Sequence, residues 1–318
     1  MKRVVVTGGA GFIGSHLCRA LVRSGAHVVC VDDFTTGTSN NLMDLIDDER
    51  FTFIHHDVTA PLPVKGEVHQ VFNLACPASP RWYQMDPVRT MRICVLGAIH
   101  ALELAERTGA TVLQASTSEV YGDPHVHPQP ETYRGNVNPV GPRACYDEGK
   151  RAAETLFSDY TRSRNVRTRI ARIFNTYGPG MWATDGRVVS SFVSQAIKGE
   201  PLIVYGAGQQ VRSFCFVSDT VRALIRLMDH PAPALGPINI GRPEETAIID
   251  LARTVIKLTG STSTIKHAPL PKDDPCVRRP DITAAKSILG WEPLTPLIVG
   301  LEITTAWFRQ PHAKGAAL

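Results

Sequence analysis

The chain has 318 residues, of which 43% are hydrophobic and 20% are charged, and its formal net charge at pH 7 is +4. These values are ordinary for a globular protein that buries a large core. Basic residues are scattered without a long run of one sign, and no apolar run approaches the ~20 residues that a membrane span needs. We therefore expect neither nucleic acid nor a membrane among its partners.

The cysteines and histidines suggest neither disulfides nor a metal site. Seven cysteines are an odd number, and they lack the paired spacing of metal ligands. His125 and His127 flank prolines and have no partner at ligand spacing. The first residues lead straight into a predicted strand, so we expect no signal peptide. These features predict a cytoplasmic protein with free thiols and no metal.

The first strand, turn and helix predict a dinucleotide site. A β-branched run at residues 2–7 is followed by Gly8-x2-Gly11-x2-Gly14 and by an amphipathic helix to about residue 24. Glycines allow a tight turn and let backbone amides approach a pyrophosphate at a helix N-terminus. A second strand, 27–31, ends at Asp32, where a ribose-binding carboxylate belongs. An acid at this position favours NAD over NADP, because a 2′-phosphate would meet a negative charge.

Strands and helices alternate over the first ~170 residues, which predicts an α/β fold with a doubly wound parallel (Rossmann) sheet. Further strands are expected at 51–55, 68–74, 111–115 and 167–172. Helices are expected at 87–107, from residue 146, at about 185–198 and from about residue 246. We expect a Rossmann domain over 1–173, to which 217–241 returns. A smaller C-terminal α/β substrate domain is expected over 174–216 and 242–318.

Tyr146 and Lys150 stand four residues apart at the head of an amphipathic helix, so they share one helix face. A nearby positive charge favours a phenolate and would lower the phenol's pKa from about 10. The pair alone is a weak signal, because this spacing is common in helices. Residues 116–119 follow a strand at the edge where such sheets bind ligands, although local capping would also explain the hydroxyls.

Longer stretches of the chain resemble the extended short-chain dehydrogenase/reductases, and within them the UDP-glucuronate decarboxylases. The similarity covers roughly residues 2–309 and is carried by residues 73–80, 116–124, 136–151 and 185–190 and by Asp273-Asp274-Pro275. It implies a carboxy-lyase that uses NAD to convert UDP-glucuronate to UDP-xylose through a UDP-4-keto intermediate. It also implies a homodimer whose C-terminal domain binds the nucleotide sugar.

The resemblance further implies a role for individual residues. The catalytic residues would be Thr117, Tyr146 and Lys150 as a hydroxyl–Tyr–Lys triad, with Ser118, Glu119 and Arg212. NAD would be bound by Gly8, Gly11, Phe12, Ile13, Gly14, Asp32, Asp57, Val58, Leu74, Ala75, Tyr146, Lys150 and Thr176. The UDP-sugar would be bound by Arg92, Glu119, Asn175, Arg187, Arg212 and Arg278.

Other interpretations stay open at this point. The same chemistry could stop at a released UDP-4-keto-pentose with NADH, or the chain could be a nucleotide-sugar 4-epimerase or 4,6-dehydratase. Ser118 stands where 4,6-dehydratases carry Asp, which argues against a dehydratase. A non-catalytic NAD sensor would typically lack the Tyr or the Lys. Cys94 and His100 stand where relatives often carry Asn, and Gly180 stands where they carry Arg. The absence of Asn at positions 94 and 100 leaves open how a proton relay behind Tyr146 is completed.

Overall fold

A seven-stranded sheet forms the centre of the computed structural model, which describes residues 1–270 and 277–310. The similar stretch Asp273-Asp274-Pro275 lies outside the described residues. The strand order is β11-β6-β5-β4-β1-β2-β3, and every neighbouring pair is parallel. The strands are β1 (Arg3–Thr7), β2 (His27–Asp32), β3 (Phe51–His55), β4 (Gln70–Asn73), β5 (Thr111–Thr117), β6 (Arg167–Ile173) and β11 (Leu235–Ile240). The predicted doubly wound sheet is confirmed, and its order reverses between β1 and β4.

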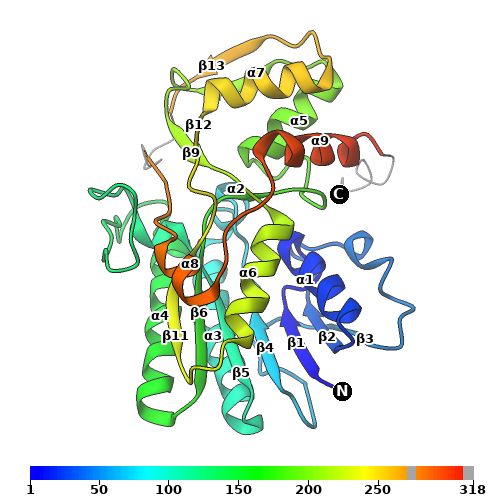
Figure 1. Ribbon diagram of the computed structural model, residues 1–318, viewed down its shortest axis with the longest axis vertical. Coiled ribbons are helices and arrows are strands. Elements are labelled where there is room, and N and C mark those ends of the chain that lie inside the picture. Colours follow the sequence, from blue (N-terminus) through cyan, green and yellow to red (C-terminus); the bar gives the residue numbers. More distant parts are fainter. Residues whose placement is uncertain (271–276, 311–318) are drawn as a thin grey trace.

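Helices cover both faces of the sheet because alternate strand residues point to opposite sides. Val4 and Val6 pack in one core cluster with α1 (Phe12–Arg23) and α6 (Val217–Asp229). Val5, between them, packs in the other cluster with α3 (Pro87–Thr108) and α4 (Ala144–Arg164). Figure 1 shows these helices flanking the strands. The continuous valine run of β1 is therefore buried on both sides.

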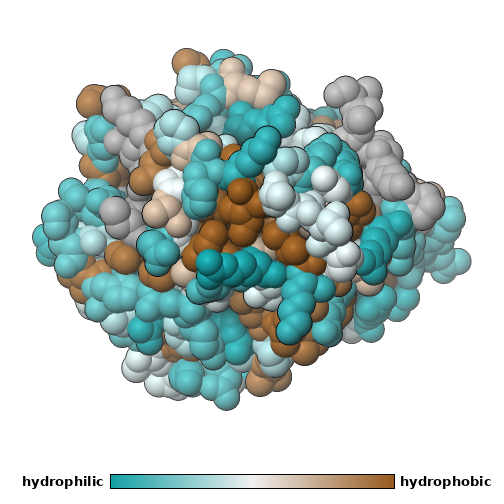
Figure 2. Space-filling view, turned by 90° about the horizontal axis from the view of Figure 1, so that it is seen from above, coloured by the Kyte–Doolittle hydropathy of each residue, from teal (hydrophilic) through white to brown (hydrophobic). Residues whose placement is uncertain are grey.

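A smaller group of elements lies at the other end of the molecule from the N-terminus (Figure 1). It contains α5 (Val188–Lys198), α7 (Ile248–Thr259) and α9 (Leu297–Phe308), with β8 (Leu202–Tyr205) pairing β13 (Ile265–Ala268) and β9 (Val211–Ser213) pairing β12 (Glu245–Ala247). Its outer face gathers hydrophobic residues at the centre, framed by hydrophilic ones (Figure 2). Helix α8 (Thr283–Leu289), which lies between β13 and α9 in the chain, packs against β11 and α6.

Several element boundaries differ from those that the sequence predicts. The helix expected from residue 185 begins at Val188, because Arg187 adopts an extended conformation at its N-cap. Residues near 246 form β12, so α7 begins only at Ile248. Short elements complete the fold: η1 (Ser39–Leu42), α2 (Pro80–Tyr83), η2 (Ser118–Tyr121), β7 (Thr176–Tyr177) and β10 (Cys215–Phe216). In the described ranges, no helix has the length and apolarity to cross a bilayer.

Candidate active site

The glycine loop between β1 and α1 is closed tightly against its neighbours. Gly8 has a φ of +69°, and a Cβ there would lie 2.7 Å from the amide nitrogen of Ala75. A Cβ on Gly14 would lie only 2.0 Å from the carbonyl oxygen of Gly8. Side chains are thus excluded where the loop turns into the helix. Helix α1 begins after Gly11 without a side-chain cap, so its first amides face the loop.

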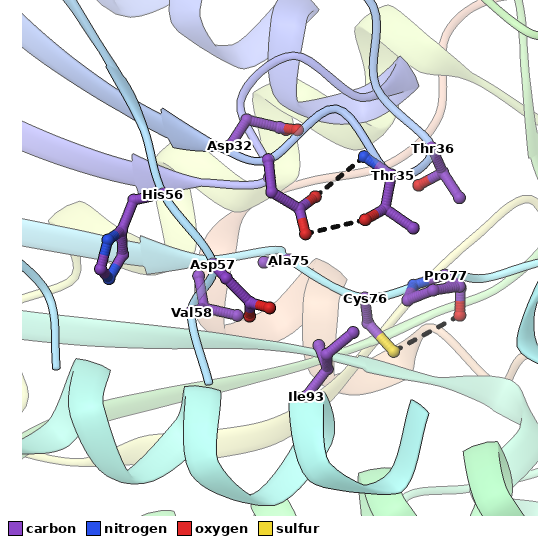
Figure 3. A pocket seen from close by; sticks show the side chains of 12 residues that line it. Asp32, Thr35, Thr36, His56, Asp57, Val58, Ala75, Cys76, Pro77 and Ile93 are labelled. Carbon is purple, nitrogen blue, oxygen red and sulfur yellow. Dashed lines mark hydrogen bonds between the residues drawn. The ribbon is translucent and has the colours of Figure 1, made fainter. Parts of the chain in front are cut away.

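A pocket opens beside this loop, at the carboxyl ends of β1 to β4 (Figure 3). Asp32 ends β2 and is 7% exposed, and its carboxylate accepts hydrogen bonds from the amides of Ala10 (3.0 Å) and Phe34 (2.8 Å). Burial raises the pKa of Asp32, and these two hydrogen bonds oppose the shift. The predicted residues Gly8, Asp32, Asp57, Val58 and Ala75 all line the pocket. Leu74 precedes Ala75, and its amide donates to the Thr7 carbonyl.

Arg89, at the start of α3, is a residue that sequence reasoning missed. Its guanidinium donates to Asp33 (2.7 Å) and to Asp57 (3.2 Å), two carboxylates that line the pocket. The sequence of the loop 35–41 contains no Lys or Arg, but Arg89 of α3 contacts this loop at the Thr35 hydroxyl. Arg89 lies 56 positions from Asp33, so only the fold could reveal this pair.

Tyr146, Lys150 and Thr117 meet where α4 begins and β5 ends. Tyr146 is 5% exposed, and its phenol hydrogen-bonds with the Thr117 side chain. The Lys150 ammonium lies 5.8 Å from the centroid of the Tyr146 ring and donates to the carbonyl of Ala115 (2.9 Å). The residues of the predicted triad therefore lie together, on the two elements that the sequence indicated.

The pKa of Tyr146 differs from the expectation that Lys150 lowers it. Burial raises the pKa of this phenol well above its ordinary value, and the neighbouring Cys76 raises it further, whereas the hydrogen bond with Thr117 lowers it. Desolvation of the phenolate is the largest cause of this shift. The phenol is therefore protonated in this form of the protein.

Glu119 forms a buried ion cluster next to the triad. Arg278 binds its carboxylate with two hydrogen bonds of 2.5 and 2.8 Å, and Arg143 adds a third of 2.7 Å. Burial would raise the pKa of Glu119, but the two guanidinium groups outweigh it and hold the pKa below its usual value. The carboxylate of Glu119 is therefore ion-paired with residues that lie 24 and 159 positions away in the sequence. Arg143 was missed, although it lies in a stretch that carries the family resemblance.

Asp147 lies among the same charges and behaves in the opposite way. It is 6% exposed, and its Oδ1 has no hydrogen-bond partner among the described residues. Burial, followed by repulsion from Glu119, raises the pKa of Asp147 to about 8. Two arginines therefore face one ionised carboxylate and one neutral carboxyl at neutral pH. The cluster carries one net positive charge.

The remaining predicted site residues make contacts with other parts of the chain. Ser118 is buried at the start of η2, and Arg212 is buried on β9, where it donates to the Val211 carbonyl. Arg187 stacks 5.7 Å from the ring of Phe12, which starts α1 with Ile13, and pairs with Asp185. The carbonyl of Asn175 accepts from the Cys215 amide. The hydroxyl of Thr176 contacts Thr220 and Phe174, and Arg92 is exposed on α3.

The pocket fits NAD. The glycine turn provides the close backbone approach that a pyrophosphate needs, and Asp32 ends the second strand beside it. Asp33 and Asp57 add two further carboxylates to the pocket lining, both paired with Arg89, so the acidic groups of the pocket outnumber this cation. Among residues 1–270 and 277–310, no group of three or more His, Cys, Asp or Glu side chains is placed to hold a metal ion.

The fold and site define a class of protein: a doubly wound α/β enzyme with a dinucleotide pocket beside a Thr–Tyr–Lys triad. A model of the NAD dependent epimerase/dehydratase family matches residues 4–241. UDP-glucuronic acid decarboxylase 4 of Arabidopsis thaliana is 54% identical over 308 residues, which cover 97% of this chain and 69% of that protein. UDP-glucuronic acid decarboxylase 1 of Xenopus tropicalis is 50% identical over 309 residues, covering 97% and 72%.

Solved structures agree with this class. UDP-glucose 4-epimerase of Thermotoga maritima, solved with UDP-glucose, has a TM-score of 0.87 at 28% identity and covers 96% of this chain and 98% of that one. The dTDP-glucose 4,6-dehydratase DesIV of Streptomyces venezuelae, solved with NAD, has a TM-score of 0.88 at 25% identity, covering 96% and 97%. The chain belongs to the NAD dependent epimerase/dehydratase family and, within it, to the UDP-glucuronic acid decarboxylases.

Proposed function

We propose that this chain converts UDP-glucuronic acid to UDP-xylose and carbon dioxide. The observation that carries the proposal is the buried Glu119–Arg143–Arg278 cluster, whose net positive charge lies beside the triad. A site that oxidises a neutral sugar needs no such charge, whereas a hexuronic acid brings a carboxylate to it. Relatives at 50–54% identity that are named UDP-glucuronic acid decarboxylases support the same substrate.

The chemistry explains why a redox cofactor belongs in a decarboxylase. Direct loss of carbon dioxide from the sugar would leave an unstabilised carbanion at C5. Oxidation at C4 first makes the acid a β-keto acid, so that the electrons of the breaking bond enter an enolate. NAD, when bound, accepts the C4 hydride and returns it after carbon dioxide has left. The cycle therefore begins and ends with the same oxidation state of the cofactor.

In this proposal the triad moves the proton at the C4 oxygen. Tyr146, protonated in the form described above, first gives its own proton to solvent; as the phenolate it then takes the proton of the C4 hydroxyl and later returns it. Lys150, whose ammonium lies 5.8 Å from the centroid of the Tyr146 ring, stabilises the phenolate that forms. Thr117, already hydrogen-bonded to Tyr146, donates to the C4 oxygen and stabilises the charge of the enolate.

The ion cluster would hold the carboxylate until it leaves. Arg278 and Arg143 keep Glu119 ionised and leave one positive charge for the acid of the sugar. We propose that Glu119, Ser118 or Arg212 then positions the water or donor that protonates C5. Arg187, Asn175 and Arg92 are proposed to contact the nucleotide sugar, and Thr176 the cofactor side.

Replacing Tyr146 by Phe tests the proposed role of the phenol. We expect turnover of UDP-glucuronic acid to fall by about 10²- to 10⁴-fold, because the variant has no group to move the C4 proton. The ring and its stacking on Tyr83 are kept, so NAD should bind with unchanged affinity. Turnover measured by chromatography, with NADH fluorescence as the binding control, decides the point. Near-normal rates would remove Tyr146 from the mechanism.

We also propose the two-domain division given by the sequence, a cytoplasmic location and a homodimer. Free thiols at all six described cysteines support a reducing compartment. The exposed Met85 and Val88, near the start of α3, support an interface on that side of the molecule. Size-exclusion chromatography with light scattering should give about twice the 34.7 kDa mass of one chain. A clean monomer mass would overturn the dimer.

A further inference from the structure

Two thiols are in contact between the cofactor pocket and the triad. The sulfurs of Cys76 and Cys94 lie 3.4 Å apart and are not bonded. Cys76 follows β4 in the loop that lines the pocket and is partly exposed (Figure 3), whereas Cys94 is buried on α3. One member of the pair can thus be reached through the pocket, and the other lies directly behind it.

Cys94 is packed against the helix that carries the triad. A Cβ added to Gly149 of α4 would lie 2.9 Å from the Cβ of Cys94 and 3.0 Å from its sulfur. Gly149 directly precedes Lys150, and the positive charge of Lys150 lowers the pKa of both thiols, although burial and the thiol neighbour raise that of Cys76 overall. The hydrogen bond from Cys76 lowers the pKa of Cys94. Oxidants attack the ionised form of a thiol, which the positive charge of Lys150 favours at both sulfurs.

We propose that Cys76 and Cys94 form a modification site, at which a peroxide makes a disulfide that disables the cofactor pocket. The pocket-facing thiol of Cys76 loses its proton and its sulfur attacks one peroxide oxygen; the O–O bond breaks, and the departing hydroxide takes up that proton. This gives a sulfenic acid on Cys76 and one molecule of water. The sulfur of Cys94 then attacks the sulfenic sulfur, the S–O bond breaks, and the departing oxygen leaves as a second water. The two thiols together lose two electrons, and one peroxide gains them.

Closing this bond must move the wall of the pocket. The sulfurs have to approach from 3.4 Å to about 2.05 Å, a change of more than 1 Å. The moving loop includes Ala75, whose amide nitrogen lies within 2.7 Å of where a Cβ of Gly8 would be. The glycine turn has no room to follow. Displacing this wall removes contacts with the cofactor, so we expect NADH to bind about tenfold more weakly, a loss of about 1.4 kcal/mol.

A second pair of thiols in the same domain provides an internal control. Cys18 and Cys30 are hydrogen-bonded to each other and both are 0% exposed beneath Gly9. They have the same chemistry as Cys76 and Cys94 but do not line the pocket. If access through the pocket governs oxidation, this pair stays reduced in the folded protein.

The test uses the full reduced chain, treated with hydrogen peroxide, alkylated and mapped by mass spectrometry without reduction. We expect a peptide linking Cys76 to Cys94, reduced Cys18 and Cys30, and slower linking when NAD is present. NADH affinity should be about tenfold weaker until dithiothreitol is added. Cys94→Ser should abolish the link and the dithiothreitol-reversible loss of affinity. Cys145→Ser, which removes a nearby thiol, should retain both.

Several results would overturn the proposal: no link in the wild-type chain, a link with unchanged NADH affinity, or equally rapid oxidation of Cys18 and Cys30. The wild-type mapping decides even if Cys94→Ser does not fold. The readouts are a crosslink and cofactor binding, so they do not require the proposed decarboxylation. A chain that crosslinks and loses NADH affinity, but never consumes UDP-glucuronic acid, would overturn the proposed function alone.

Discussion

At the scale of single residues, Tyr146 is held in place before any substrate arrives. Its ring stacks on Tyr83 with centroids 5.0 Å apart and planes within 2°. Tyr83 is itself 1% exposed, and its carbonyl accepts a hydrogen bond from Thr90 (3.1 Å). Such aromatic packing contributes about 0.5–1.5 kcal/mol beyond burial and fixes the direction of the phenol. Orientation here comes from packing, and charge comes from Lys150 and the ion cluster.

Asp147 makes the stability of this site depend on pH. The pKa of its buried carboxyl is about 8, whereas an unfolded chain has the ordinary value near 3.8. The folded state thus binds the proton more tightly, so this contribution is complete below about pH 4 and is lost as the pH rises toward 8. We expect the free energy of unfolding of the wild type to fall by a few kcal/mol from pH 5 to pH 8. Asp147→Asn should lack this fall.

Urea denaturation of both proteins at pH 5 and pH 8 measures the difference. Asp250→Asn is the matched control, because the Asp250 carboxyl is exposed on α7. This variant should show the same fall in the free energy of unfolding as the wild type. An identical change in the free energy of unfolding between pH 5 and pH 8 in Asp147→Asn and the wild type would show that Asp147 is ionised throughout this range.

At the scale of elements, Arg169 joins β6 to the end of α6. It is 2% exposed, and its guanidinium donates to the carbonyls of Leu227 (3.0 Å), His230 (2.6 Å) and Ala232 (2.6 Å). Carbonyls at a helix C-terminus lack partners within the helix and carry partial negative charge. The planar fork of arginine satisfies several of them at once, which a lysine cannot do.

Arg169→Lys should therefore destabilise the protein by about 3 kcal/mol, through carbonyls left unpaired in the interior. Arg167→Lys, an exposed position on the same strand, should change stability by less than about 0.5 kcal/mol. Thermal denaturation of the two variants gives the comparison. Equal melting temperatures would mean that water replaces the lost donors without penalty.

Strands and the dinucleotide loop could be predicted from the sequence because their signals are local. The valine run of β1, the glycines after it and Asp32 all lie within 32 residues. The ion cluster could not be predicted in this way, because Arg278 lies 159 positions from Glu119 and the two meet only through the fold. The pKa of Tyr146 also depends on burial by side chains from several elements, which no spacing of residues reveals.

At the scale of the whole molecule, the two groups of elements bring different functions to one site. The sheet positions the glycine loop, Asp32 and the triad, and residues beyond it supply Arg278 to Glu119. A reaction that oxidises and then reduces the same carbon must keep its cofactor between the two steps. We therefore expect no net release of NADH during turnover.

Proton NMR of the full chain incubated with UDP-glucuronic acid and NAD tests this central claim most directly. We predict that UDP-xylose accumulates while NADH, followed by absorbance in the same sample, stays below the enzyme concentration. A UDP-4-keto-pentose that accumulates with stoichiometric NADH would contradict the closed cycle, because the site would then release its intermediate before the second hydride transfer. Unchanged UDP-glucuronic acid would contradict the proposed function itself.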